Sequence, residues 1–163
     1  MVTVFRPGDL FELADRIEKR GREFYERMSR DAFTPRSREL FERLAREEGE
    51  HESEFRRIVG EALAMPFEIP DGYASPEMMA YLDALRRGCA LHIAAGDHRQ
   101  PPVSENQALL QAVEYEKDAI LLLHEIYDLL PPSMPARTGV AALIRAEKSH
   151  LAHICVMLGD EPS

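Results

Sequence analysis

Residues 44–55 read Leu-Ala-Arg-Glu-Glu-Gly-Glu-His-Glu-Ser-Glu-Phe, and the apolar residues around them recur at helical spacing. This period predicts a helix with one buried face. The residues on that face are Phe41, Leu44, Ala45, Glu48, His51, Phe55, Ile58 and Val59. Glu48 and His51 are three positions apart, so both side chains can reach one point. A buried carboxylate is costly unless it is paired or bound to a metal, so this motif needs a partner of one kind or the other.

The same Glu-x-x-His motif occurs again at Glu147 and His150, on a second apolar stripe. Two other predicted helices each place one glutamate, Glu18 and Glu116, on an apolar face. Glu18 precedes Glu48 by 30 residues, and Glu116 precedes Glu147 by 31 residues, so the chain repeats internally. Each half predicts a helix hairpin, and two such hairpins pack as a four-helix bundle with one long crossover.

The expected fold is therefore all-α, with an extra helix in the crossover. Helices are predicted over about 10–30, about 35–64, about 77–95, about 105–130 and about 137–158. Asp9, Thr34, Ser75 and Ser104 are the expected cap residues, and Pro135 is expected to lie in the break before the last helix. No segment alternates apolar and polar residues as a strand does.

Composition predicts one globular domain over residues 1–163. The formal net charge of −9 argues against nucleic acid and anionic membranes as partners. No apolar run is long enough to span a membrane, and no signal peptide is recognisable, so we expect a cytoplasmic protein. Cys89 and Cys155 belong to no Cys-x-x-Cys pair and are expected to be small buried residues.

The polar residues on the four buried stripes predict one shared site. Four converging carboxylates would repel each other in an apolar core, whereas two divalent cations would neutralise them. Oxygen and nitrogen donors favour iron or manganese, a mixed iron–manganese pair included, and zinc less clearly. The alternative is that these are ordinary solvated helix charges, because glutamate is common in this chain. The predicted ligands are Glu18, Glu48, His51, Glu116, Glu147 and His150.

Four segments carry a resemblance to a known superfamily: 18–25, 48–51, 116–118 and 147–150. One glutamate from each of two helices and Glu-x-x-His from the other two is the pattern of ferritin-like di-iron carboxylate proteins. The chain resembles that superfamily, and most closely its rubrerythrin-like branch, which implies a ferritin-like bundle. The resemblance also implies that the Tyr25 hydroxyl lies near the metals and hydrogen-bonds a ligand carboxylate. A core aromatic residue with a polar tip is the alternative interpretation.

Departures from the family pattern refine the expectation. Peroxidase rubrerythrins resemble this chain but have a further carboxylate where Ala119 stands. No rubredoxin-like Cys-x-x-Cys motif is present, so the resemblance is to an erythrin type that needs a separate electron-donor protein. Gly49 stands where bacterioferritins have their haem-binding methionine, so no haem is expected. Ferritin cages that store iron add a short helix after the bundle, whereas only five residues follow Leu158 here. Iron storage is therefore the weaker interpretation.

The function implied is oxidation of Fe(II) by peroxide or dioxygen, as in a rubrerythrin-like peroxidase or ferroxidase. Two alternatives stay open, an iron-handling or storage protein and a bundle whose metal site is only structural. A homodimer is expected, because bundles of this kind often pair through an outer face. His92, His124 and His153 are expected to lie outside the ligand set, and the acidic run 47–54 is expected to be mostly solvated.

Overall fold

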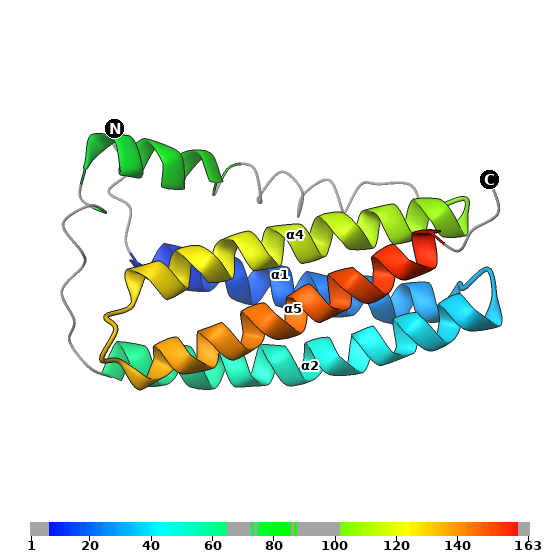
Figure 1. Ribbon diagram of the computed structural model, residues 1–163, viewed down its shortest axis with the longest axis horizontal. Helices are drawn as coiled ribbons and strands as arrows, with labels where there is room; N and C mark the ends of the chain where they lie inside the picture. Colours follow the sequence, from blue (N-terminus) through cyan, green and yellow to red (C-terminus); the bar gives the residue numbers. More distant parts are fainter. Residues whose placement is uncertain (1–6, 65–72, 74, 86, 88–101, 160–163) are drawn as a thin grey trace.

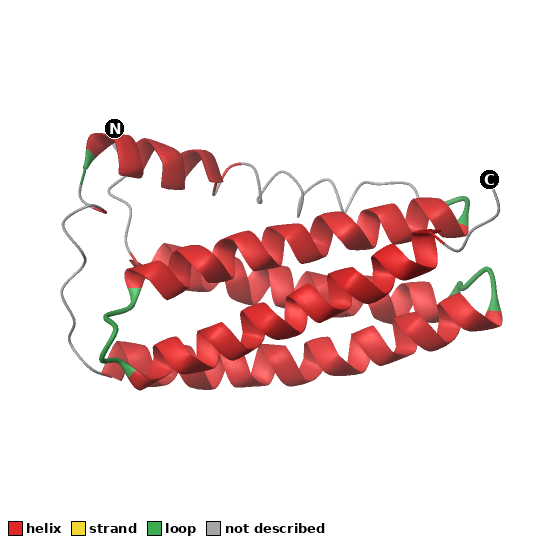
Figure 2. Cartoon of the chain, in the orientation of Figure 1, coloured by secondary structure: helices red, strands yellow, loops and turns green. Residues whose placement is uncertain are grey.

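The computed structural model describes residues 7–64, 73, 75–85, 87 and 102–159. Its four long helices are α1 (Pro7–Arg30), α2 (Pro35–Ala64), α4 (Glu105–Leu129) and α5 (Pro135–Gly159). They form an elongated bundle (Figure 1). Figure 2 draws no strand in the described part of the chain. The predicted all-α, ferritin-like four-helix bundle is confirmed.

Hydroxyl side chains begin several of the helices, as the sequence predicts. Thr34 Oγ1 accepts a hydrogen bond from the backbone N–H of Ser37 at 3.1 Å, and Pro35 occupies the first helical position. Ser104 Oγ accepts the N–H of Gln107 at 3.2 Å. Ser75 Oγ accepts the N–H of Met78 at 3.1 Å, which begins the crossover helix over residues 76–85. The part of that helix predicted beyond residue 87 lies outside the described residues.

Two helices begin earlier than the sequence predicts, and proline is the reason in both cases. α1 begins at Pro7, so Asp9 lies within its first turn instead of preceding it. α5 begins at Pro135, which was expected to lie in the break before the helix. Proline suits the first helical turn because the N–H that it lacks would have no partner there.

The helices pair as two hairpins, α1 with α2 and α4 with α5. Across the bundle, α1 packs against α4 and α2 packs against α5. α2 and α4 run in the same direction (Figure 1), so the chain must return along the bundle between them. In this crossover, Leu82 is fully buried against the apolar core.

The buried apolar side chains form two clusters, and on each long helix a buried glutamate lies between them in sequence. One cluster contains Leu10, Phe55, Leu123 and Val140, and the other contains Phe24, Phe41, Leu109 and Ile154. Glu18, Glu48, Glu116 and Glu147 fall between these groups on α1, α2, α4 and α5. The polar site is therefore enclosed at both ends by apolar packing, which restricts its access to water.

The last helix, α5, is closely packed at one position and exposed at another. A Cβ atom added to Gly139 of α5 would lie 2.6 Å from Ile58 Cδ1 of α2, so the two helices approach closely there.

Cys155 is exposed, so the expectation that it is buried is wrong, because it faces away from the α5 stripe that contains Ile154. Cys89 lies outside the described residues. No helix in the described part of the chain has the length and hydropathy needed to cross a membrane.

Candidate metal centre

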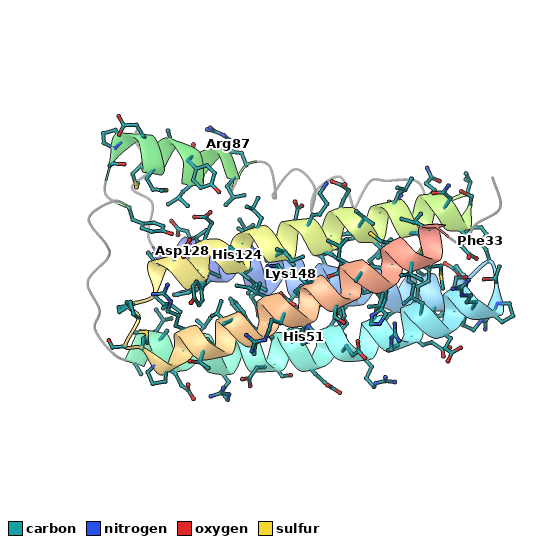
Figure 3. The ribbon with its side chains drawn as sticks, viewed as in Figure 1. Phe33, His51, Arg87, His124, Asp128 and Lys148 are labelled. Atoms are coloured by element: carbon teal, nitrogen blue, oxygen red, sulfur yellow. The ribbon has the colours of Figure 1, made fainter. Side chains whose placement is uncertain are left out.

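The six predicted ligand side chains come together in the middle of the bundle. α1 contributes Glu18, α4 contributes Glu116, and α2 and α5 each contribute one Glu-x-x-His pair. All four glutamates are buried, and Glu147 is 0 % exposed. His150 is also buried, whereas the His51 side chain is 14 % exposed. Figure 3 labels His51 on the α2 side, facing α5.

The two Glu-x-x-His motifs face each other across the α2–α5 contact. One ligand atom from each of Glu48, His51, Glu147 and His150 lies within 4.8 Å of the others. His51 Nδ1 is 2.7 Å from Glu147 Oε1, and His150 Nδ1 is 2.9 Å from Glu48 Oε1. Each histidine therefore approaches a glutamate from the other half of the chain. The two imidazole rings stack with their centroids 5.0 Å apart.

These close atoms are not satisfied by hydrogen bonds. Both carboxylate oxygens of Glu18 and of Glu147, and Nδ1 of both histidines, are buried without a hydrogen-bond partner among the described residues. Unsatisfied buried polar atoms are rare and costly in folded proteins. Donor atoms that converge this closely without good hydrogen-bond geometry are an arrangement that a bound metal ion satisfies. The donor set therefore fits divalent metal ions.

Without metal, most of the ionisable groups in the cluster have pKa values above their usual range. Burial and the neighbouring Glu147 and Glu48 raise the pKa of Glu18 well above its usual value. Burial likewise raises the pKa of Glu116. Burial would also raise the pKa of Glu147, but His150 and His51 outweigh it and lower that pKa to about 2. Burial disfavours the charged forms of both histidines, yet the surrounding carboxylates raise the pKa of each imidazole.

A tyrosine and a small cavity complete the side of the site between α1 and α4. The Tyr25 hydroxyl, fully buried, donates a short hydrogen bond to Glu116 Oε1. A cavity of about 10 Å³ adjoins the carboxylates and is lined by Gly21 and Ala119 among others. Its volume is about that of one water-sized sphere. The absence of longer side chains at Gly21 and Ala119 leaves this space beside Glu18 and Glu116.

The family model for Rubrerythrin matches residues 9–87. This match covers Glu18, Tyr25, Glu48 and His51, the first half of the site, on the same bundle that the structure shows. The match over residues 9–87 supports a rubrerythrin-like member of the ferritin-like superfamily. Residues 116–150 lie beyond the matched range, and the fold brings the second half of the rubrerythrin-like pattern to the same point. No curated protein and no solved structure matches the chain.

The structure adds a residue to this rubrerythrin-like site that sequence reasoning missed. Glu47 Oε2 lies 3.0 Å from His150 Nε2, on the side of the ring opposite Nδ1. Such a contact fixes the ring orientation and leaves Nδ1 to face the carboxylates. Glu47 was expected to be a solvated charge, because nothing in the run 47–54 distinguishes it from its acidic neighbours. Only the α2–α5 contact, which joins residues 103 positions apart, identifies it.

Glu52 is a second departure from the expectation of a solvated acidic run. It is only 7 % exposed, and it pairs with Arg22 of α1 at 2.9 Å and with Arg56 at 2.5 Å. Arg56 also contacts Asp15 at 2.8 Å. These ion pairs tie α1 to α2 one turn from the Glu-x-x-His motif.

The remaining histidines lie apart from the cluster of ligand atoms. His153 is exposed on α5, and His124 is half-buried on α4 (labelled in Figure 3). Neither is among the four residues whose donor atoms converge. His92 lies outside the described residues.

Proposed function

We propose that this chain is a dinuclear carboxylate metalloprotein that oxidises Fe(II) with hydrogen peroxide or dioxygen. The observation that supports this most is the set of unsatisfied oxygen and nitrogen atoms that four helices direct to one buried point. The rubrerythrin-like family membership supports a redox role over a purely structural one. The proposal treats residues 1–163 as one domain.

The proposed ligands are Glu18, Glu48, His51, Glu116, Glu147 and His150. Four carboxylates balance the charge of two divalent ions, and two neutral imidazoles complete the donor set. Iron is the metal we propose, with manganese, a mixed iron–manganese pair and zinc as alternatives to be separated by elemental analysis. Bound iron would supply one-electron redox chemistry between its divalent and trivalent states. Gly49 offers no haem ligand, so haem is not part of the proposal.

The chain's own residues prepare the site for such a reaction. Tyr25 holds one oxygen of Glu116 by a hydrogen bond, so this carboxylate has a fixed orientation. Burial raises the pKa of the Tyr25 hydroxyl, so the hydroxyl keeps its proton and remains a donor. The cavity beside Gly21 and Ala119 provides space for about one water-sized molecule next to the carboxylates. The apolar clusters at both ends exclude bulk water.

Metal stoichiometry tests the ligand assignment directly. Protein purified without added metal and then loaded with Fe(II) under anaerobic conditions should bind about two ions per chain, the number that four carboxylates balance. Glu48→Ala and His150→Ala should each reduce this number. Glu50→Ala, an exposed neighbour on the same helix, should leave it unchanged. Unchanged iron content in both ligand variants would overturn the assignment.

Peroxide then distinguishes a redox site from a storage or structural site. Addition of hydrogen peroxide to the reduced, loaded protein should produce a rapid change in the optical spectrum, with catalytic turnover when a reductant protein is supplied. Uptake of many more than two irons per chain, together with a large assembly in light scattering, would indicate iron storage instead. A higher melting temperature with metal and no reaction with peroxide would indicate a structural site.

The partners of this reaction are also proposals. Residues 1–163 contain no Cys-x-x-Cys pair of the kind that holds a rubredoxin iron. We therefore propose a separate electron-donor protein, a homodimeric state and a cytoplasmic location. Size-exclusion chromatography with light scattering tests the dimer, and reduction of the oxidised protein by a purified rubredoxin tests the donor.

A further inference from the structure

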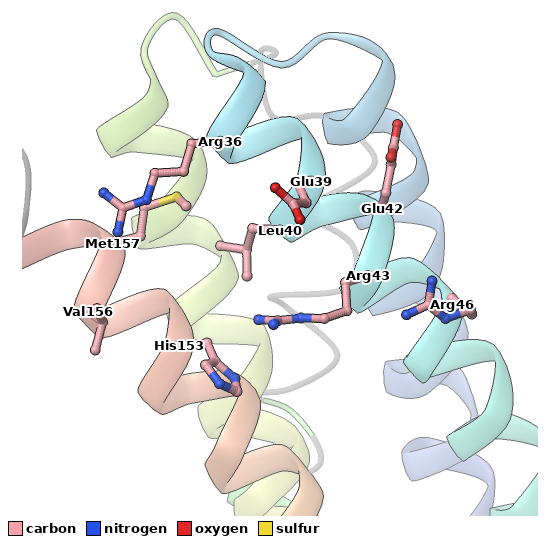
Figure 4. Close-up of a pocket in the computed structure, with 9 residues that line it drawn as sticks. All are labelled: Arg36, Glu39, Leu40, Glu42, Arg43, Arg46, His153, Val156 and Met157. Atoms are coloured by element: carbon pink, nitrogen blue, oxygen red, sulfur yellow. The ribbon is translucent and has the colours of Figure 1, made fainter.

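A second polar hollow lies between α2 and α5, toward the end of the bundle where α1 and α2 connect (Figure 4). It has a volume of about 400 Å³, within the range of sites that bind small molecules. Arg36, Arg43, Arg46 and His153 line it, together with Glu39 and Glu42. Three arginines against two glutamates give a positive hollow on a chain of net charge −9.

Arg43 is the residue that points to a ligand. Its side chain extends from α2 toward α5 across the hollow, whereas Glu42 points away from its guanidinium (Figure 4). Arg43 Nε is buried and has no hydrogen-bond partner in the part of the chain that the structure describes. A buried guanidinium nitrogen without an acceptor is costly, and the planar guanidinium is suited to a carboxylate or a phosphate group.

The floor of the same hollow is apolar. Leu40 and Met157 are buried beneath it, and Val156 is 60 % exposed beside it. A ligand that used the whole hollow would therefore have an anionic group near the arginines and a compact apolar part against Val156. None of the residues that line the hollow is a proposed metal ligand, so the hollow is distinct from the carboxylate site.

We propose that the hollow between α2 and α5 binds a small organic anion, whose carboxylate or phosphate group pairs with Arg43 and its neighbouring arginines. The apolar part of the anion lies on Val156 and Met157. This site is formed by side chains that do not belong to the proposed ligand set, and it does not depend on the proposed iron chemistry.

Isothermal titration calorimetry of the full chain tests this with four probes. Phenyl phosphate and benzoate represent the two anionic groups, benzyl alcohol is the neutral analogue, and inorganic phosphate lacks the apolar part. We expect saturable binding of phenyl phosphate, benzoate or both, and the stronger of the two identifies the preferred group. Benzyl alcohol and inorganic phosphate should each bind at least about tenfold more weakly. Equal binding of either control, or no saturable binding of any probe, would overturn the proposal.

Two variants that remove charges of opposite sign from the lining of the hollow make the test specific. Arg43→Gln should weaken binding by about tenfold or more, because it removes a charge-assisted pair. Glu39→Gln should strengthen binding by about two- to fivefold, because a carboxylate that lines the hollow no longer repels the anion. Arg38→Gln, which removes the same charge from the same helix outside the hollow, should change binding by less than about twofold.

Folding does not confound this set of variants. Glu39 is exposed, so Glu39→Gln tests the proposal even if thermal melting shows that Arg43→Gln is unfolded. Equal weakening by Arg43→Gln and Arg38→Gln would mean that the probe senses only overall charge, and the site assignment would be wrong. A Glu39→Gln variant that binds more weakly than the unaltered chain would also contradict it.

Discussion

The two hairpins of the bundle contribute the same kinds of side chain, but they surround their histidines differently. His51, from the α1–α2 hairpin, is partly exposed and approaches one carboxylate, Glu147, at 2.7 Å. His150, from the α4–α5 hairpin, is buried and approaches Glu48, Glu147 and, at 3.7 Å, Glu116. Its other ring nitrogen is held by Glu47. The sequence repeat is therefore nearly symmetric, whereas the site that it builds is not.

This difference predicts two metal positions of unequal strength. An imidazole that is held on both sides loses little freedom when it binds a metal, so it is a better ligand than one that is partly free. The position nearest His150 should then be occupied first as metal is added.

Removing each histidine in turn should have the largest effect. His150→Ala should weaken binding of the tighter metal by more than about 100-fold, whereas His51→Ala should leave that metal bound and weaken mainly the second one. Stepwise titration with Fe(II) under anaerobic conditions, or with Co(II) followed by its absorption, measures both affinities. Equal losses in the two variants would show that the positions are equivalent.

Lower pH should weaken metal binding at both positions. The raised pKa values of Glu18, Glu116 and both histidines mean that these groups hold protons when no metal is bound. Metal must displace these protons, so affinity rises with pH and falls as pH decreases, by about tenfold per unit for each proton released. Calorimetry in buffers of different ionisation enthalpy counts the protons. A metal affinity that is constant between pH 5.5 and 7.5 would show that metal binding does not displace protons from these groups.

The Glu47 contact accounts for part of the difference between the histidines. Glu47→Gln keeps the size of the side chain and removes its charge, and we expect the tighter metal affinity to fall by about 10- to 100-fold. Glu50→Gln is the matched control on the same helix, with an exposed side chain, and should have no effect. If Glu47→Gln affected the weaker position instead, the proposed order of the two positions would be reversed.

The contact between α2 and α5 brings the two halves together, and its substitution should change stability and not metal affinity. Gly139→Ala would place a methyl group against buried Ile58, and we expect a loss of stability of about 1–3 kcal/mol. Gly60→Ala, in an open position of α2, should increase stability by about 0.5–1 kcal/mol. Thermal or urea unfolding of the metal-free protein measures both changes. A neutral Gly139→Ala variant would show that α2 and α5 can separate there without cost.

The helical bundle was predictable because each long helix has a strong apolar period and several helices begin at a hydroxyl cap. The six proposed ligands could be named for a related reason, since a glutamate on an apolar stripe is conspicuous. Glu47 and Glu52 could not be distinguished in the same way, because both lie within a run of similar acidic residues. Their environment is set by contacts with His150 and Arg22, and local periodicity carries no information about such distant partners.

The exchange of partners between the halves has a consequence for the origin of the fold. His51 faces Glu147, and His150 faces Glu48, so neither hairpin holds a complete set of donors. A half-length chain that paired with a second copy of itself would already contain every donor type in the same crossed arrangement. Joining two copies in one gene would then release each copy from identity with the other. Changes such as the recruitment of Glu47 by a single histidine become accessible only after that fusion.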